Sequence, residues 1–441
     1  MAHAMPKPKL FRDPVHDTIA LPQESPGDRL LVVLLDTAEM QRLRRIRQLG
    51  LTNLVYPGAE HSRFQHSLGV LWLAHQMLAR LGRRVSIGQD TRTIVLVGAL
   101  LHDVGHGPMS HALEAVTGIR HERWTEAIIR APDSGIGRVL RAHDPGLPDR
   151  IVALFGKGPL PAGTPAFARE IVSSQLDADR LDYILRDGHA TGVRIGSYDL
   201  ARIMALLEPT QDGAGAADQH LAIHVGAQEA VEGYLLARFH MYKQVYLHKT
   251  SRAAERMLEA ALRRAALLGR GGADPFGRLI RGETLSPSEF ATLDDVDVLA
   301  ALKRWTDDAD PSLADLARGL VGGRALWKPL ALAGDETRAA EQIEAARAVA
   351  RVRGYEPDAA VLVDTSRDSL YRPFTGLRAA GDTSHDDSIR LVDGEGRAAF
   401  IEDRSEVVKM LAHLEVRQRL LCVHPGIRDP VAKTLRVAAD A

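Results

Sequence analysis

The sequence predicts a mainly α-helical protein whose C-terminal part is a mixed α/β region. Apolar residues recur every three or four positions through most of the stretch 36–268, which is typical of amphipathic helices. Short runs that favour strands gather after residue 353. Hydrophobic residues make up 45% of the 441 residues and aromatic residues only 5%, so we expect a large and mostly aliphatic core.

The predicted helices of the first 270 residues are separated by residues that break helices. Apolar periodicity marks four helical segments: 68–81, 94–101, 171–186 and 230–266. Helix breakers lie between them: Gly82, Gly107-Pro108, Gly118 and the Gly- and Pro-containing loop 155–159. A small hairpin is expected around 213–217, before a strand at 221–225. We therefore expect one helical core domain over residues 1–270.

The composition changes after the glycine-rich stretch 269–272, and we expect a separate region over residues 271–441. The segment 285–333 still favours helices, and Ser286-Pro287 is a good helix start. Three strands are then predicted, the last two joined by Asp393-Gly394-Glu395-Gly396: 360–363, 389–392 and 398–401. A helix around 405–421 is expected to end the region.

The charge and the cysteine content exclude several classes of binding protein and of metal or disulfide site. Lys and Arg number 56 and Asp and Glu 57, so the net charge of −1 gives no electrostatic case for a nucleic-acid or membrane-surface binder. The single cysteine, Cys422, excludes an internal disulfide and a thiolate zinc cluster. The apolar runs 30–35 and 93–101 are too short to cross a bilayer. We expect a cytoplasmic protein in which His and carboxylate side chains hold any metal.

Histidines and aspartates form the most informative pattern. Seven of the 18 histidines fall between residues 61 and 121, and the apolar segment 94–101 runs directly into His102-Asp103. Burying that pair without partners is costly, whereas a metal ion satisfies imidazole and carboxylate together. Two further ligands are needed: upstream, His66 lies at the start of an amphipathic helix, and downstream, Asp179 and Asp187 lie along one face of the predicted helix 176–187. The alternative is a capped or exposed His–Asp pair, but the ordered set favours a metal; His61 and His75 are interpreted as ordinary histidines.

A site of two His and two Asp suits Mn, Fe, Mg or Zn, with one ion held tightly and room for a second that arrives with substrate. The order His66, His102-Asp103, Asp179 resembles the HD-domain metal phosphohydrolases. It is most similar to the branch of deoxynucleoside triphosphate (dNTP) triphosphohydrolases related to the animal sterile-alpha-motif/HD-domain enzyme. The similar segments span about residues 10–250: 11–16, 41–50, 56–70, 102–111, 177–187 and 246–249.

The resemblance implies hydrolysis of a dNTP to a deoxynucleoside and inorganic triphosphate. It implies that His66, His102, Asp103 and Asp179 hold the metal, which activates a water for attack on the α-phosphorus. Four residues are implied in proton transfer and in contact with the α-phosphate: His111 as the acid, Glu114 and His121 as its partners, and His106 against the phosphate.

The resemblance also assigns the substrate pocket. Phosphates are expected to meet Arg63, Arg180, Arg238 and Lys249. The sugar is expected to meet Gln48 and Asp187 at its 3′-hydroxyl and Tyr183 and Tyr246 at its 2′ side, with Leu49 and His248 completing the pocket. A guanine-nucleotide (GTP or dNTP) activator site is implied at a subunit interface of a homo-oligomer, a dimer or tetramer: Asp36, Gln41 and Arg44. Basic residues for a second activator are not recognisable around 224–226.

Two other functions fit the same metal ligands. An HD-type phosphodiesterase or nucleotidase would act on another nucleotide, but His106 stands where those enzymes often carry Lys, and Gln48 and the paired tyrosines favour a deoxynucleotide. A non-catalytic nucleotide sensor would keep only the fold, and the intact ligands together with His111 argue against it.

Overall fold

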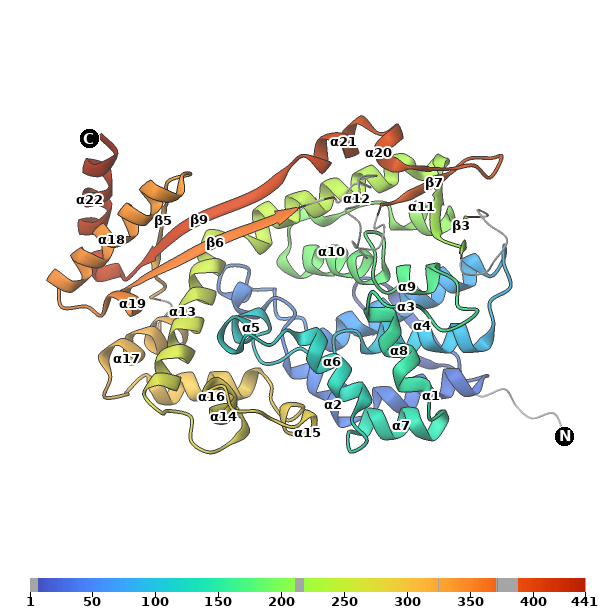
Figure 1. Cartoon of the computed structure of the whole chain (residues 1–441), viewed down its shortest axis with the longest axis horizontal. Helices are drawn as coiled ribbons and strands as arrows, with labels where there is room; N and C mark the ends of the chain where they lie inside the picture. The colour runs from blue at the N-terminus through green and yellow to red at the C-terminus, as the bar shows by residue number, and fades with distance from the viewer. Residues whose placement is uncertain (1–6, 211–217, 324, 370, 372–387, 441) are drawn as a thin grey trace.

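The computed structural model describes residues 7–210, 218–323, 325–369, 371 and 388–440, and it is mainly α-helical, as predicted (Figure 1). The chain starts with a hairpin of β1 (Lys9–Asp13) and β2 (Asp17–Leu21). Helices follow to the middle of the chain: α1 (Pro26–Leu35), α2 (Ala38–Arg42), α3 (Arg63–Leu81), α4 (Gln89–Leu101), α5 (His111–Thr117), α6 (His121–Arg130), α7 (Gly135–His143), α8 (Leu147–Phe155), α9 (Phe167–Glu170), α10 (Ala178–Thr191) and α11 (Leu200–Ala205).

The second half of the chain alternates helices with short sheets. Two strands and two long helices come first: β3 (Leu207–Pro209), β4 (Leu221–His224), α12 (Gln228–Met241) and α13 (Lys249–Leu267). Short helices and a long one follow: α14 (Pro275–Ile280), α15 (Pro287–Phe290), α16 (Asp295–Trp305), α17 (Pro311–Ala317), β5 (Lys328–Ala331), α18 (Glu336–Val352) and α19 (Pro357–Ala360). The C-terminal elements are β6 (Val361–Ser369), β7 (Arg390–Val392), β8 (Ala398–Phe400), α20 (Ile401–Arg404), α21 (Glu406–Ala412), β9 (Glu415–Val423) and α22 (Arg428–Asp440).

The central helices form because their apolar faces meet in one core. Residues 94–101 of α4 are all nearly inaccessible to solvent, so α4 lies between α3 and α8 with apolar side chains on every side. Ser62 caps α3 in a capping box with Gln65, and Asp177 caps α10 through the backbone N–H of Arg180. These caps fix where α3 and α10 begin, close to the residues expected to bind metal.

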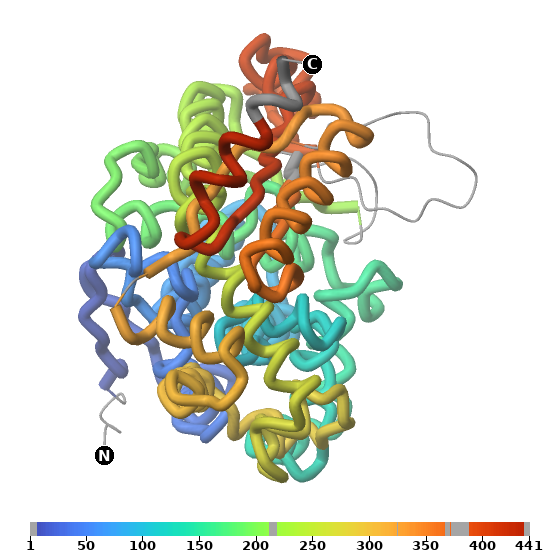
Figure 2. The backbone as a smooth tube through the Cα atoms, turned by 90° about the vertical axis from the view of Figure 1, so that its left-hand side faces the viewer, coloured from blue at the N-terminus to red at the C-terminus, as the bar shows by residue number. Residues whose placement is uncertain are grey.

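A second, smaller apolar core lies between α18, α22 and the sheet β5-β9-β6. In this antiparallel sheet Val361 of β6 pairs with Val423 of β9, and Asp364 pairs with Leu420. Figure 1 shows β6 and β9 running from this core back across α13, and Figure 2 shows α18 and α22 side by side. The C-terminal region is therefore tied to the helical core by two long strands.

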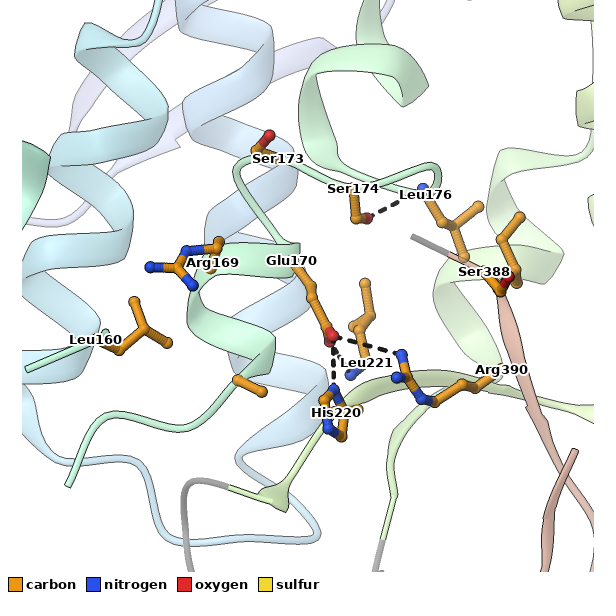
Figure 3. A pocket seen from close by; sticks show the side chains of 12 residues that line it. Leu160, Arg169, Glu170, Ser173, Ser174, Leu176, His220, Leu221, Ser388 and Arg390 are labelled. Carbon is orange, nitrogen blue, oxygen red and sulfur yellow. Dashed lines mark hydrogen bonds and ion pairs between the residues drawn. The ribbon is translucent and has the colours of Figure 1, made fainter. Parts of the chain in front are cut away.

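A four-stranded sheet joins β7 to the helical core. Its strand order is β3-β4-β7-β8, with β4 and β7 parallel and the other pairs antiparallel. The carboxylate of Glu170, at the end of α9, lies between His220 and Arg390 (Figure 3). It also accepts a hydrogen bond from the backbone N–H of Leu221, at 2.6 Å. One carboxylate thus holds β4 and β7 against α9.

Three of the predicted elements are wrong, each because tertiary contacts override local propensity. Residues 171–177 form turns, and the helix begins only at Ala178, where Asp177 caps it. Residues 328–331 and 415–421, both predicted as helix, are the strands β5 and β9, since they pair with each other and β9 also pairs with β6. The chain accordingly ends on α22 and not on a helix at 405–421.

The remaining predictions about the fold are confirmed in part and untested in part. The helices at 68–81 and 94–101, the capped start at Ser286 and the strands near 361, 390 and 398 are confirmed. The predicted helical segment 230–266 is interrupted at Leu247 and His248, which separate α12 and the turn after it from α13. The strands on either side of the predicted hairpin, β3 and β4, pair antiparallel as expected, while its turn at 213–217 lies outside the described residues. The domain boundary at residue 270, between α13 and α14, stays a prediction. Among the described residues, no helix combines the length and apolar character needed to cross a membrane.

Candidate active site

Three helices bring the predicted metal ligands together. His66 comes from the first turn of α3, His102 and Asp103 follow the last residue of α4, and Asp179 lies in the first turn of α10. The Nε2 atoms of His66 and His102 are 3.3 Å apart, and Asp179 Oδ1 is 3.0 Å from the first and 3.7 Å from the second. Asp103 Oδ1 is 3.4 Å from His102 Nε2. His66, His102 and Asp179 therefore reach one point, and Asp103 lies beside it, with its Oδ2 3.9 Å from His66 Nε2.

The two imidazole rings are oriented to present Nε2 to that point. His66 Nδ1 is 2.8 Å from Asp182 Oδ2, and His102 Nδ1 is 2.9 Å from the carbonyl oxygen of Ala99. With Nδ1 engaged as a donor, each ring keeps Nε2 as the metal-binding atom, an arrangement common to metal-bound histidines. The donor set of two imidazole nitrogens and carboxylate oxygens fits a divalent cation such as Mn, Fe, Mg or Zn.

The electrostatics of the site also favour a cation. Burial opposes protonation of His66, yet its hydrogen bonds with Asp179 and Asp182 raise the pKa of the ring to about 10. Burial likewise opposes ionisation of Asp179, but hydrogen bonds from His102 and His66 lower the pKa of its carboxyl well below the usual range. The carboxylates that hold a proton here can hold a metal ion in its place.

A buried network behind His66 was not predicted from the sequence. Asp182, one turn beyond Asp179 on α10, accepts from His16 Nε2 at 2.6 Å and from Arg186 Nε at 2.7 Å. Arg186 in turn donates to Asp13 at the end of β1, at 2.8 Å. The N-terminal hairpin therefore packs directly behind the predicted metal ligands. The available signals were the i, i+3 spacing of Asp179 and Asp182 and the place of His16 in the segment 11–16.

The predicted acid and its partners form a second cluster beside the metal ligands. His121 Nδ1 is 2.8 Å from Glu114 Oε1, and His111 Nδ1 is 3.6 Å from the same oxygen. His106 stacks on His121 with ring centroids 3.7 Å apart, and its Nε2 is 3.3 Å from Asp103 Oδ1. His111 is the most exposed of these side chains, so it can meet a substrate while Glu114 holds its other nitrogen.

Both clusters open into one cavity of about 440 Å³, a size typical of ligand sites. Twelve of the lining residues come from the metal ligands, the acid cluster and the expected sugar contacts or their neighbours: Gln48, Leu49, Arg63, Asp103, His106, Ser110, His111, His121, Asp179, Tyr183, Asp187 and Tyr246. Tyr246 donates its hydroxyl to Asp187 at 2.8 Å, and His61 Nε2 is 2.8 Å from the other Asp187 oxygen. The Asp187 side chain therefore holds both Tyr246 and His61 in the predicted pocket.

Four predicted phosphate or pocket residues lie outside this set of lining residues, and their roles stay predictions. Arg180 forms an ion pair with Asp177 and donates to the carbonyl oxygen of Ser174. Arg238 is buried with its guanidinium 5.7 Å from the ring centroid of Tyr242. His248 caps α13, and Lys249 is exposed at the first residue of that helix.

The cavity also contains residues that sequence reasoning did not single out. Tyr242 lies beside Tyr246, with ring centroids 5.1 Å apart, and Arg252, Glu255 and Leu258 line the cavity from α13. Arg252, Glu255 and Leu258 follow the last recognisable motif in the sequence and Tyr242 precedes it by one turn, so only their helical spacing from Tyr246 could have indicated them.

The predicted activator residues lie together away from the cavity. Asp36 is exposed and pairs with Lys9 at 3.1 Å. Gln41 accepts from Arg44 Nε at 2.8 Å, and the Arg44 guanidinium lies 3.7 Å from the ring centroid of Phe64. Phe64 is two residues from His66 on α3, so this surface borders the helix that carries one of the predicted metal ligands.

Comparison with known proteins finds matching families, similar sequences and a similar structure. The HD domain family matches residues 63–142, and the HD associated region matches residues 213–438. The uncharacterized protein YwfO of Bacillus subtilis is 33% identical over 96% of this chain and 95% of its own. The deoxynucleoside triphosphate triphosphohydrolase SAMHD1 of Homo sapiens is 30% identical over 60% of this chain, which spans 46% of that enzyme. A phosphohydrolase structure from Bacteroides thetaiotaomicron superimposes over 95% of this chain with a TM-score of 0.76 and 29% identity.

Proposed function

The chain belongs to the family of HD-domain phosphohydrolases, and on that premise we propose that it hydrolyses dNTPs to a deoxynucleoside and inorganic triphosphate. The observation that carries the proposal is the position of Asp103 and Asp179, beside His66 and His102, in the wall of a cavity that also contains a Tyr183, Tyr246 and Asp187 cluster. The similarity to SAMHD1 supports the substrate class.

The residues at the metal end account for attack on the α-phosphate. When bound, a divalent cation supplies charge stabilisation of the phosphoryl group and activation of a water nucleophile. Arg63 is fixed by an ion pair with Asp103 and by a hydrogen bond to Ser110 Oγ at 3.1 Å, so its guanidinium is held beside the position of the phosphate. Burial and the neighbouring Arg63 lower the pKa of His106 well below the usual range, so this ring is a neutral phosphate partner.

The acid cluster accounts for departure of the 5′-oxygen. The leaving oxygen needs a proton, and His111 lies at the cavity with one nitrogen toward Glu114. Burial opposes ionisation of Glu114, but hydrogen bonds from His111 and His121 outweigh it and lower the pKa of this carboxyl well below its usual range. The ionised Glu114 lies beside His111 Nδ1, and we assign to His111 the donation of the proton to the leaving oxygen.

The sugar end accounts for selection of a deoxyribose. Gln48 Oε1 is buried and has no hydrogen-bond partner among the described residues, so it is available to accept from a 3′-hydroxyl. The Tyr246 ring is fixed by its hydrogen bond to Asp187 and by edge contact with Tyr183 at 6.1 Å. A rigid aromatic wall at this place leaves no room for a 2′-hydroxyl.

The proposal is tested by incubating the purified protein and Mn²⁺ with each dNTP and each ribonucleotide and identifying the products. We expect inorganic triphosphate and a deoxynucleoside from dNTPs and little turnover of ribonucleotides. Release of pyrophosphate or single phosphate would contradict the proposal. Hydrolysis confined to cyclic nucleotides would favour a phosphodiesterase, and binding without turnover would favour a sensor.

We further propose that a guanine nucleotide binds at Asp36, Gln41 and Arg44 in a cytoplasmic homo-oligomer. Sedimentation and activity with and without GTP test this. We expect GTP to promote assembly or turnover in the wild type but not in Arg44→Ala, and identical behaviour of the two proteins would contradict it.

A further inference from the structure

Arg252 is the one cavity-lining cation among the described residues that carboxylates hold from two directions. Its Nε donates to Asp364 Oδ1 at 3.1 Å, its Nη2 donates to the same carboxylate, and its Nη1 donates to Glu255 Oε2 at 2.5 Å. Asp364 lies on β6 and is completely buried, whereas Arg252 and Glu255 are 16% and 24% exposed toward the cavity. The guanidinium is therefore fixed in position at the cavity wall.

This wall is formed by a different helix from those that carry the predicted metal ligands. Asp179, Tyr183 and Asp187 enter the cavity from α10, which packs against α3 and α12. Arg252 and Glu255 enter from α13, which packs against α5, β6 and the short turn η2 (Gly50–Leu54). A nucleotide with its phosphates at the metal end and its sugar at Tyr246 extends its base toward a remaining wall.

The charge at this wall disfavours a phosphate and favours a neutral partner. Arg252 is flanked by the carboxylates of Asp364 and Glu255, and Arg256 Nε lies 3.5 Å from the same Asp364 carboxylate, so the charge of Arg252 is already balanced and it is not a free cation for a triphosphate. The two carboxylates accept three of the five guanidinium N–H groups among the described residues, which leaves two donors. Two parallel donors match two adjacent acceptors on a ligand.

We propose that Arg252 contacts the nucleobase and selects guanine, and that Asp364 and Glu255 position it. This inference rests on the proposed function and adds the base preference to it. Guanine offers N7 and O6 as adjacent acceptors, the pair that an arginine contacts in a bidentate manner. Adenine has an amino group in place of O6, so one arginine donor would face another donor. Cytosine and thymine lack N7.

Arg256 provides a matched control for a purely structural role. It lies one helical turn beyond Arg252 on α13, and its Nε is 3.5 Å from the same Asp364 oxygen. Its guanidinium lines a different cavity, between α13 and α19, with Glu259 and Glu356. If the ion pairs only attach β6 to α13, substitution of either arginine should affect all substrates alike.

The test compares kcat/KM for dGTP, dATP, dITP and 7-deaza-dGTP, because changing the substrate leaves the fold intact. We expect dGTP to exceed dATP by about tenfold or more, dITP to resemble dGTP, and 7-deaza-dGTP to fall by a similar factor because it lacks N7. In Arg252→Gln these ratios should approach one, whereas Arg256→Gln should keep them. Glu255→Ala should reduce the ratios, and Glu255→Gln should restore them since its amide oxygen can still accept from Nη1.

The failure of this inference differs from the failure of the proposed function. Equal hydrolysis of dGTP and 7-deaza-dGTP by the wild type, or equal loss of selectivity in the Arg252 and Arg256 variants, would overturn the role of Arg252 and leave dNTP hydrolysis standing. Absence of hydrolysis of every dNTP would overturn both.

Discussion

Gly69 allows the metal-binding helix to approach the network behind it, and replacing it by Ala is the sharpest test of that packing. A Cβ at this position in α3 would lie 1.9 Å from Asp182 Oδ1 and 2.5 Å from Arg186 Nη2. Ordinary contact for such a carbon starts at 3.4 Å. Because Asp182 holds the His66 ring and Arg186 anchors Asp182, neither group can move without breaking its hydrogen bonds.

The expected cost has two parts. Forcing an extra methyl into a packed core costs about 1–3 kcal/mol. Breaking a buried ion pair costs about 3–5 kcal/mol, so we expect Gly69→Ala to lower the free energy of unfolding by about 3 kcal/mol or more. Displacement of the carboxylate that orients His66 should also weaken metal binding by about 10–100-fold.

Urea unfolding and the metal content of the dialysed protein measure the two effects. Gly233→Ala is the matched control, because Gly233 also lies inside a helix, α12, and an added Cβ there meets no atom within 4 Å. The control should be neutral or gain up to about 1 kcal/mol, since Ala favours helices over Gly. Native stability and full metal content in Gly69→Ala would refute the role assigned to Asp182 and Arg186.

Three further predictions concern the site itself. Asp179→Ala should abolish turnover and tight metal retention, because the site loses an anionic ligand; unchanged metal content by mass spectrometry would mean that another carboxylate binds the ion. Tyr246→Ala should raise ribonucleotide turnover relative to dNTP turnover, while Tyr246→Phe, which keeps the ring, should retain selectivity; equal loss on both substrates would show that the ring only packs. The pKa of Glu114 is lower in the folded protein than its ordinary value of 4.5, so its stabilising effect is present above that pH and is lost as the pH falls. Glu114→Gln should therefore lose less stability than the wild type between pH 6 and pH 3 in urea titrations, and parallel curves would contradict the assignment.

The helical core and the convergence of His66, His102 and Asp179, with Asp103 beside them, could be predicted because the relevant signals are local. Apolar spacing marks α3 and α4, and the ligands lie at or directly after helix ends where the sequence itself shows caps and breakers. The order of the motif residues along the chain then indicated which three helices bring the predicted ligands together.

The network of Asp182, His16 and Arg186 could not be predicted in the same way, because its members are far apart in the sequence. His16 and Asp182 are 166 positions apart, and no periodicity links them. Strand β9 was missed for a related reason. Its residues include good helix formers such as Glu415, Gln418 and Leu420, and only pairing with β5 and β6 on both sides makes them a strand.

Hydrolysis of dGTP in ¹⁸O-labelled water with Mn²⁺ tests the central claim most directly, since it reports both the bond that breaks and the atom that water attacks. Attack on the α-phosphorus next to the four metal ligands predicts unlabelled deoxyguanosine and inorganic triphosphate that carries one ¹⁸O, with neither product formed by Asp179→Ala. Label in a deoxynucleoside monophosphate released with pyrophosphate, or in the 5′-hydroxyl of deoxyguanosine, would contradict the mechanism.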